Sequence, residues 1–166
     1  SMNLFSKKNR SIINFIGIPI IVSSIYFSLL FPLMIAIMLY FCSLEYANLI
    51  SRIGGKINKS LLVLLNAIIF INLLYGFIDS LSILTIFFIL LFSNEVLFND
   101  KANPINCAYY FIGIFWIGYA LSGCLYQIRS FENGVFFTFM LFLGIWICDT
   151  FAYIFGSKFG KRRILE

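Results

Sequence analysis

Residues 134–163, GVFFTFMLFLGIWICDTFAYIFGSKFGKRR, decide the fold class of this protein. The stretch begins with about 20 mostly apolar residues, which is the length that an α-helix needs to cross a membrane. Four cations follow between Lys158 and Arg163, an arrangement typical of the cytoplasmic end of a span. One acid, Asp149, lies within the apolar part and needs a separate explanation.

Composition extends this interpretation to the whole chain. Of its 166 residues, 61% are hydrophobic and 11% are charged, whereas a soluble domain is roughly 45–50% apolar. The sequence therefore predicts an integral membrane protein and excludes a soluble one. Ser1 precedes Met2 and resembles a residue left by tag removal, so it takes no part in the functional argument.

Six apolar runs are long enough to cross a membrane, so we expect an all-α polytopic membrane protein with a single domain over residues 1–166. Only two residues separate the first two runs, which leaves one long bent hairpin as the alternative. Pro19 is expected to kink the first run, while Pro32 and Pro104 suit the first turn of a helix. The runs cover residues 12–29, 32–50, 61–78, 81–98, 104–126 and 134–155.

The basic residues predict the orientation of these spans. With the N-terminus inside, eleven of the twelve Lys and Arg residues fall on the cytoplasmic side, as the positive-inside tendency requires. Only Arg129 falls outside. Both termini are therefore expected in the cytoplasm. Topology and anionic lipid headgroups explain the net charge of +5 without nucleic acid as a partner.

The inventory of reactive side chains excludes several kinds of site. Histidine is absent, which removes a Ser-His triad and a histidine-based zinc site. The four cysteines have no paired metal-ligand spacing, so we interpret them as small hydrophobic residues. They are Cys42, Cys107, Cys124 and Cys148.

Three of the seven acids lie inside the apolar runs: Glu45, Glu95 and Asp149. In this topology they precede a cytoplasmic end by five, three and six residues, which is within about 10 Å at 1.5 Å per residue. An acid in a span usually faces a cavity or a partner, so function is the first hypothesis. Two structural alternatives stay open: Glu95 as a hydrated interfacial residue, and Glu45 as an anchor for Arg52 or Lys56.

Asp149 is the deepest of the three acids. At helical spacing it shares a face with Tyr153 and Gly156, where glycine leaves room for close approach. The cations after it also have a structural explanation, because they suit both the helix dipole and the positive-inside tendency.

The stretch from Cys148 to Arg163 resembles the motif of the phosphatidate cytidylyltransferases, the CDP-diacylglycerol synthase family of polytopic membrane enzymes. That motif reads D, then T or S, any residue, A, Y, then F or I with G-x-x-x-G-K and a basic residue. The segment 45–47, Glu-Tyr-Ala, is similar to an early E-W/Y-A stretch of the family. The matching positions are Asp149, Thr150, Ala152, Tyr153, Gly156, Gly160, Lys161 and Arg162.

The resemblance implies an enzyme that transfers CMP from CTP to phosphatidic acid and releases pyrophosphate. It implies Mg²⁺ as a cofactor and leaves open whether a second cation takes part. It implies a location in a bacterial inner (plasma) membrane, with membrane lipids as neighbours and a site that faces the cytoplasm. It leaves open whether the protein forms a homodimer. Asp149 would be the catalytic and metal-binding carboxylate, with Glu45 and Glu95 as further metal-ligand candidates. Substrate and phosphate contacts would come from Lys158, Lys161, Arg162, Tyr153, Gly156 and Gly160.

The sequence departs from the family pattern after Arg163. The family continues into an S-P-x-K-T-W-E-G-like stretch and a later signature with K-D, H-G-G and D-R-x-D, which residues 1–166 do not contain. We therefore expect this chain to be either the N-terminal part of a longer enzyme or a degenerate member of the family, and in both cases to be inactive alone.

Three other functions are compatible with parts of the pattern. In a six-helix transporter or channel the three acids would line an ion path with Asn14, Asn66 and Asn72, although their common depth argues against a path across the membrane. A non-catalytic membrane assembly module is the second alternative. A CTP-dependent kinase of polyprenols is the third.

The charge asymmetry predicts a topology that can be measured. Reporter fusions or cysteine-accessibility labelling at Lys7 and Arg163 should place both positions in the cytoplasm. Detection of either position on the outer side would contradict the predicted orientation.

Overall fold

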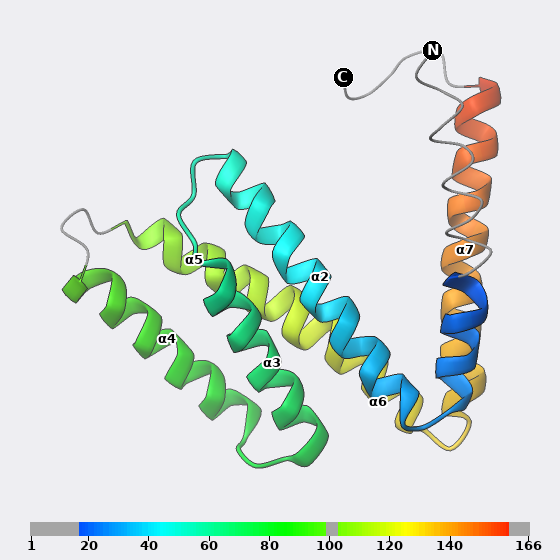
Figure 1. Ribbon diagram of the computed structural model, residues 1–166, viewed down its shortest axis with the longest axis horizontal. Coiled ribbons are helices and arrows are strands. Elements are labelled where there is room, and N and C mark those ends of the chain that lie inside the picture. The colour runs from blue at the N-terminus through cyan, green and yellow to red at the C-terminus, as the bar shows by residue number, and fades with distance from the viewer. Residues whose placement is uncertain (1–16, 99–102, 160–166) are drawn as a thin grey trace. The chain divides into compact units, whose positions relative to one another are not determined.

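A computed structural model of the protein describes residues 17–98 and 103–159 (Figure 1). Within these ranges every regular element is helical, which confirms the all-α expectation. A first helix covers Gly17–Tyr26. The later helices are α2 (Leu30–Arg52), α3 (Lys59–Tyr75), α4 (Ser80–Phe98), α5 (Pro104–Gly113), η1 (Ile114–Gly123), α6 (Cys124–Ser130) and α7 (Gly134–Phe159).

Four of the described helical segments are long and apolar enough to cross a membrane. They are α2, α4, the continuous segment Pro104–Ser130 and α7. The run expected at 61–78 is a shorter helix, because Asn58 caps its start with hydrogen bonds from the N–H groups of Ser60 and Leu61 and Gly76 ends it in the left-handed conformation.

The first two expected runs are separate helices, since one ends at Tyr26 and α2 begins at Leu30. Whether the two helices form a bent hairpin stays open, because they belong to different units of the chain. The kink expected at Pro19 stays a prediction, because the run begins at residue 12 and residues 12–16 lie outside the described part. Pro104 occupies the first turn of α5, as expected.

Contacts divide the chain into two compact units, residues 27–127 and residues 1–26 with 128–166, and each is described separately. In the first unit α3 packs against both α2 and η1 (Figure 1). Leu62, Ile69 and Ile114 are fully buried at this contact. Its core is therefore mainly apolar, with a few buried polar side chains.

Three buried glycines lie on the side of η1 that packs against the bundle, the first of them just before η1 begins. They are Gly113, Gly118 and Gly123. Residues five apart point about 140° away from each other on an α-helix. η1 is a π-helix, whose hydrogen bonds join residues five apart, so its winding brings the three glycines towards one face. A Cβ at Gly113 would lie 2.7 Å from the Tyr46 ring, which shows how closely the helices approach.

Asn66 occupies the centre of this contact and is fully buried. Its Nδ2 donates to Oγ of Ser43 at 2.9 Å, and Ser43 donates in turn to the Leu39 carbonyl. Oδ1 of Asn66 accepts no hydrogen bond. That oxygen lies 2.7 Å from the position of a Cβ at Gly118, so the glycine turns a Cα–H towards it, a weak polar contact of the kind found at helix interfaces.

The turn between α3 and α4 is closed by Asn72. Its amide accepts from the N–H of Ile78 and donates to the Ile78 carbonyl, both at 2.9 Å. Asp79 then caps α4 by accepting from the N–H groups of Leu81 and Ser82. Two polar residues of an otherwise apolar segment therefore serve the turn itself.

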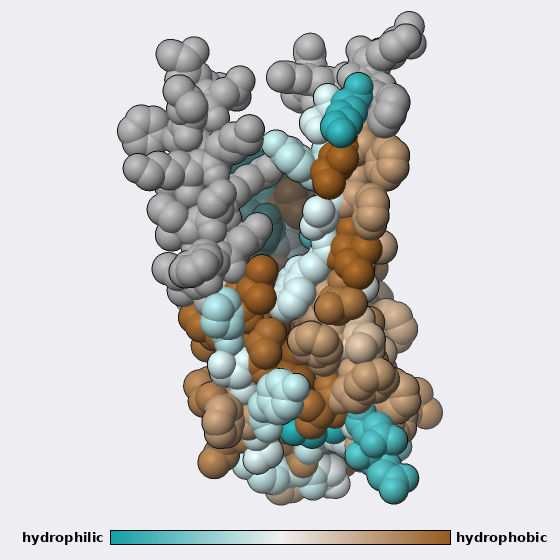
Figure 2. All heavy atoms as spheres, turned by 90° about the vertical axis from the view of Figure 1, so that its right-hand side faces the viewer, coloured by the Kyte–Doolittle hydropathy of each residue, from teal (hydrophilic) through white to brown (hydrophobic). Residues whose placement is uncertain are grey.

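In the other unit, the turn before α7 is tight. Nε of Arg129 donates to the Ile25 carbonyl at 2.9 Å, and Gly134 lies too close to the Arg129 carbonyl for any side chain. Figure 2 shows hydrophobic side chains over most of this part of the molecule, with hydrophilic groups at both ends. Only 11% of the apolar window of α7 is buried, so most of its surface is open.

The contact between Gly118 and Asn66 predicts the effect of a single methyl group. Gly118→Ala should lower the stability by about 1–3 kcal/mol, because Asn66 is held by Ser43 and cannot move aside without strain. Thermal unfolding in detergent measures the loss.

Gly144→Ala in α7 is the matched control, since a Cβ there meets nothing within 4 Å and alanine is the better helix former. Equal stability of Gly118→Ala and the wild type would contradict the proposed close contact.

Candidate functional site

Asp149 lies on α7, about three turns before the last described residue of that helix, and is exposed. Tyr153, 56% exposed, follows one turn later on the same face. A Cβ at Gly156 would meet nothing within 4 Å. The expected face of Asp149, Tyr153 and Gly156 therefore exists as a continuous open surface within this unit.

The hydroxyl groups around Asp149 do not take part in this surface. Thr150 donates to the Trp146 carbonyl at 2.7 Å, and Ser157 donates to the Ile154 carbonyl at 3.0 Å. Both hydroxyls are thus used by the helix backbone. Their donor hydrogens are therefore not available to a ligand on this surface.

An exposed carboxylate on a membrane helix has a large free-energy cost if it faces lipid. The rest of the α7 surface nearby is apolar and exposed, for example Phe151 and Phe155. Asp149 must therefore face water, a ligand or other protein when the helix lies in a membrane. This requirement distinguishes it from an acid that is already satisfied within the fold.

The cations of the motif are only partly described. Lys158 lies in the last turn of α7 and is exposed. Gly160, Lys161 and Arg162 lie outside the described residues, so their predicted role is neither supported nor opposed by the structure.

Glu95 has a different environment from Asp149. Its Oε1 accepts from the N–H of Asn103 and from Nδ2 of Asn106, both at 3.0 Å. The carboxylate therefore joins the end of α4 to the start of α5. This geometry favours a structural role for Glu95 over the metal-ligand role that was also considered.

Asn106 extends the same network to the loop between α2 and α3. Its Oδ1 accepts from the N–H of Lys56 at 3.0 Å, and Oη of Tyr110 accepts from the N–H of Asn58 at 2.5 Å. The α2–α3 loop and the α4–α5 connection thus lie at one end of the bundle. The topology predicted from the sequence also places them on one side of the membrane.

Sequence reasoning did not identify Asn106 or Tyr110 as important. Their signal was weak: a polar and an aromatic residue, four positions apart, near the start of an apolar run that begins after Asn103 and Pro104. Such spacing indicates a shared helix face, but it does not say what that face contacts. The bonds to Lys56 and Asn58 depend on a segment about 50 residues earlier.

Glu45, the third acid in a span, is exposed on α2. Within residues 17–98 and 103–159 no three acids or cysteines come together in a group that could hold a metal ion. Mg²⁺ usually takes one or two carboxylates plus phosphates and waters, so Asp149 fits the part of one such ligand.

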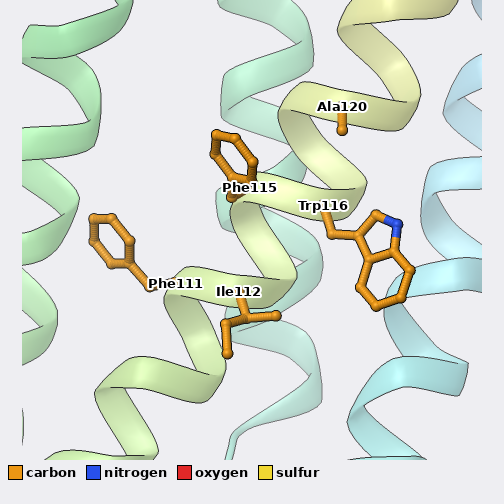
Figure 3. Close-up of a pocket in the computed structure, with 5 residues that line it drawn as sticks. All are labelled: Phe111, Ile112, Phe115, Trp116 and Ala120. Carbon is orange, nitrogen blue, oxygen red and sulfur yellow. The ribbon is translucent and has the colours of Figure 1, made fainter.

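An apolar pocket of about 470 Å³ lies on the outer face of α5 and η1 (Figure 3). Phe111 packs edge-to-face on Phe88 of α4, with ring centroids 5.5 Å apart, and Trp116 projects to the opposite side. The pocket has no polar lining. It suits a hydrocarbon chain and offers no polar group to a phosphate.

Comparison with known proteins agrees with the motif on α7. The phosphatidate cytidylyltransferase of Staphylococcus saprophyticus subsp. saprophyticus is 34% identical over 83 residues, which is 50% of this chain and 30% of the relative. The alignment thus covers less than a third of that relative. No solved structure matches the chain. The cytidylyltransferase family model matches residues 8–166, nearly the whole sequence, and the chain therefore belongs to the cytidylyltransferase family.

Proposed function

We propose that this chain is part of a phosphatidate cytidylyltransferase, which transfers CMP from CTP to phosphatidic acid and releases pyrophosphate. The observation that carries the proposal is the family match over residues 8–166 together with the open face of α7, on which Asp149 and Tyr153 of the motif lie exposed. Residues 1–166 lack the later signature rich in lysine and aspartate, so we assign catalysis to the complete protein.

The residues of the motif suit this reaction. The attacking group is the phosphate of phosphatidic acid, which is already an oxyanion, so the absence of histidine does not oppose the reaction. The charge that develops on the phosphates needs stabilisation by cations. Lys158, Lys161 and Arg162 would supply part of it, and Gly156 and Gly160 would allow the phosphates to approach the backbone.

Asp149 would serve as one oxygen ligand of Mg²⁺ in this proposal. When bound, the ion would neutralise phosphate charge. Further carboxylates would come from the rest of the complete protein. Tyr153 would line the same wall and orient the headgroup.

The proposed location follows from the topology. Asp149 lies about 9 Å from the expected cytoplasmic end of its span, at 1.5 Å per residue. Phosphatidic acid presents its phosphate at that level, and CTP arrives from the cytosol. A site that faces the cytoplasm in a bacterial inner membrane satisfies both substrates, and a homodimer is compatible with the open surface of α7.

The described polar residues give little support to the transporter alternative. Asn72 is used by the α3–α4 turn, and Asn66 is enclosed by Ser43 and Gly118. Glu95 is tied to Asn103 and Asn106. These groups serve helix packing and loop closure and do not line a polar path.

Replacement of Asp149 tests the proposal most directly. In the complete enzyme Asp149→Asn keeps the side-chain size and removes the charge. Turnover should fall by at least about 100-fold, within the range that loss of one charge-stabilising group causes, and raised Mg²⁺ should partly restore it. Formation of CDP-diacylglycerol from labelled CTP is the measurement.

Asp79→Asn is the matched control, because Asp79 caps α4 and asparagine caps a helix equally well. It should leave turnover unchanged. Near-normal turnover of a correctly inserted Asp149→Asn enzyme would assign Asp149 a structural role.

The cations of the motif give a second test. A triple Gln variant at Lys158, Lys161 and Arg162 should raise the KM for CTP or for phosphatidic acid about tenfold or more, since each loses charge-assisted hydrogen bonds. A triple Gln variant at residues 7, 8 and 10 removes the same number of cytoplasmic cations and is the control. Unchanged KM values in a correctly inserted motif variant would leave these cations with a topological role only.

A further inference from the structure

The loop between α2 and α3 presents three cations at one end of the bundle. Arg52, Lys56 and Lys59 are all exposed, and we call residues 52–59 the basic loop. Nζ of Lys59 donates to Oδ1 of Asn48 on α2 at 2.5 Å, so at least one of the three side chains has a defined position. Positive-inside topology explains the charge of this loop but does not require a defined conformation.

The backbone of the basic loop is nevertheless fixed by α5. The N–H groups of Lys56 and Asn58 donate to Asn106 and Tyr110, two side chains that are 7% and 8% exposed. Two buried side chains of a distant helix thus hold the loop between its cations. Such anchoring removes conformational freedom before a ligand arrives, which favours binding.

The same helix leads from the loop to the apolar pocket. Gly55 lies against the ring of Tyr109, since a Cβ there would be 2.7 Å from that ring. Ile112 follows Tyr109 by three residues, on the same helix face, and begins the pocket that continues through Phe115, Trp116 and Ala120 (Figure 3).

The pocket lies at the depth of the lipid hydrocarbon chains and not at the depth of the headgroups. Phe111 and Ala120 follow Pro104, the first residue of α5, by 7 and 16 positions. At the 1.5 Å per residue of an α-helix, Phe111 lies about 10 Å along the helix, and Ala120 lies deeper but at less than about 24 Å, because the π-helical part rises less per residue. The hydrocarbon core of a bilayer is about 30 Å thick. The basic loop therefore lies at headgroup level and the pocket at acyl-chain level.

We propose that the basic loop and the α5–η1 pocket together bind one anionic phospholipid of the cytoplasmic leaflet. Its phosphate contacts the cations of the loop, and one acyl chain occupies the pocket. Charge complementarity selects an anionic headgroup, and the wholly apolar lining selects a hydrocarbon chain. The site requires only insertion into a membrane, so it stands independently of the cytidylyltransferase reaction.

Photolabelling tests this site. The chain is reconstituted in phosphatidylcholine vesicles that contain phosphatidic acid with a diazirine in one acyl chain, and labelled peptides are identified by mass spectrometry. The label should map to residues 111–120. A tenfold excess of unlabelled phosphatidic acid or phosphatidylglycerol should reduce labelling at least threefold, whereas extra phosphatidylcholine should not.

Soluble phosphate compounds carry the same anionic group as the lipid headgroup but have no acyl chain. Inorganic phosphate and CTP at millimolar concentration should therefore leave labelling unchanged. If either displaces the label as well as phosphatidic acid does, the loop binds a soluble phosphate and the lipid assignment is wrong.

Variants that change no charge distinguish a lipid site that needs the fixed loop from a general effect of basic residues on topology. Tyr110→Phe removes the acceptor of the Asn58 N–H and changes no charge, so labelling should fall at least threefold. Tyr119→Phe is the matched control. It also removes one tyrosine hydroxyl from the same continuous helix, and that hydroxyl donates a hydrogen bond to the Ser80 carbonyl. Equal labelling of the two variants would overturn the role of the fixed loop.

Filling the pocket gives a test that does not depend on the loop. Ala120→Trp should abolish labelling of residues 111–120 while circular dichroism and thermal unfolding confirm the fold. If Tyr110→Phe unfolds, this variant decides the question alone. Undiminished labelling of a folded Ala120→Trp protein would overturn the proposal.

Discussion

The close approach of η1 to α3 at Gly118 is the contact on which the larger unit depends. Because the residue has no side chain, Asn66 can lie against the helix backbone and donate to Ser43 on α2. Three helices therefore meet around one buried amide. The π-helical winding of η1 turns Gly113 and Gly123 towards the same contact. An α-helical course would rotate these glycines apart and replace them at the interface by bulky side chains.

This packing has consequences at the headgroup-level end of the bundle. α5 continues directly into η1, so the position of η1 also determines where Asn106 and Tyr110 lie. These two side chains then hold the α2–α3 loop through its backbone, and Asn106 also binds Glu95 of α4. A contact at the centre of the bundle is thus linked to the arrangement of cations at its end.

The three acids illustrate what sequence reasoning can and cannot separate. Glu45, Glu95 and Asp149 share one predicted depth, and the high cost of an acid in a span made each a functional candidate. The structure separates one of them from the other two: Glu95 accepts hydrogen bonds from Asn103 and Asn106, whereas Glu45 and Asp149 are both exposed. The difference depends on partners 8 and 11 residues away from Glu95 across a loop, which periodicity does not reveal.

By itself the sequence determined the helical membrane class, the family and five of the run positions to within a few residues, because hydropathy, charge and a local motif are properties of consecutive residues. Only the tertiary structure decided the π-helical course of η1, the hydrogen bonds of Glu95 to Asn103 and Asn106 and the anchoring of the loop at Lys56 and Asn58. Each of these depends on pairs of groups that are brought together by packing, and the free energy of such a pair exists only once both helices are in place.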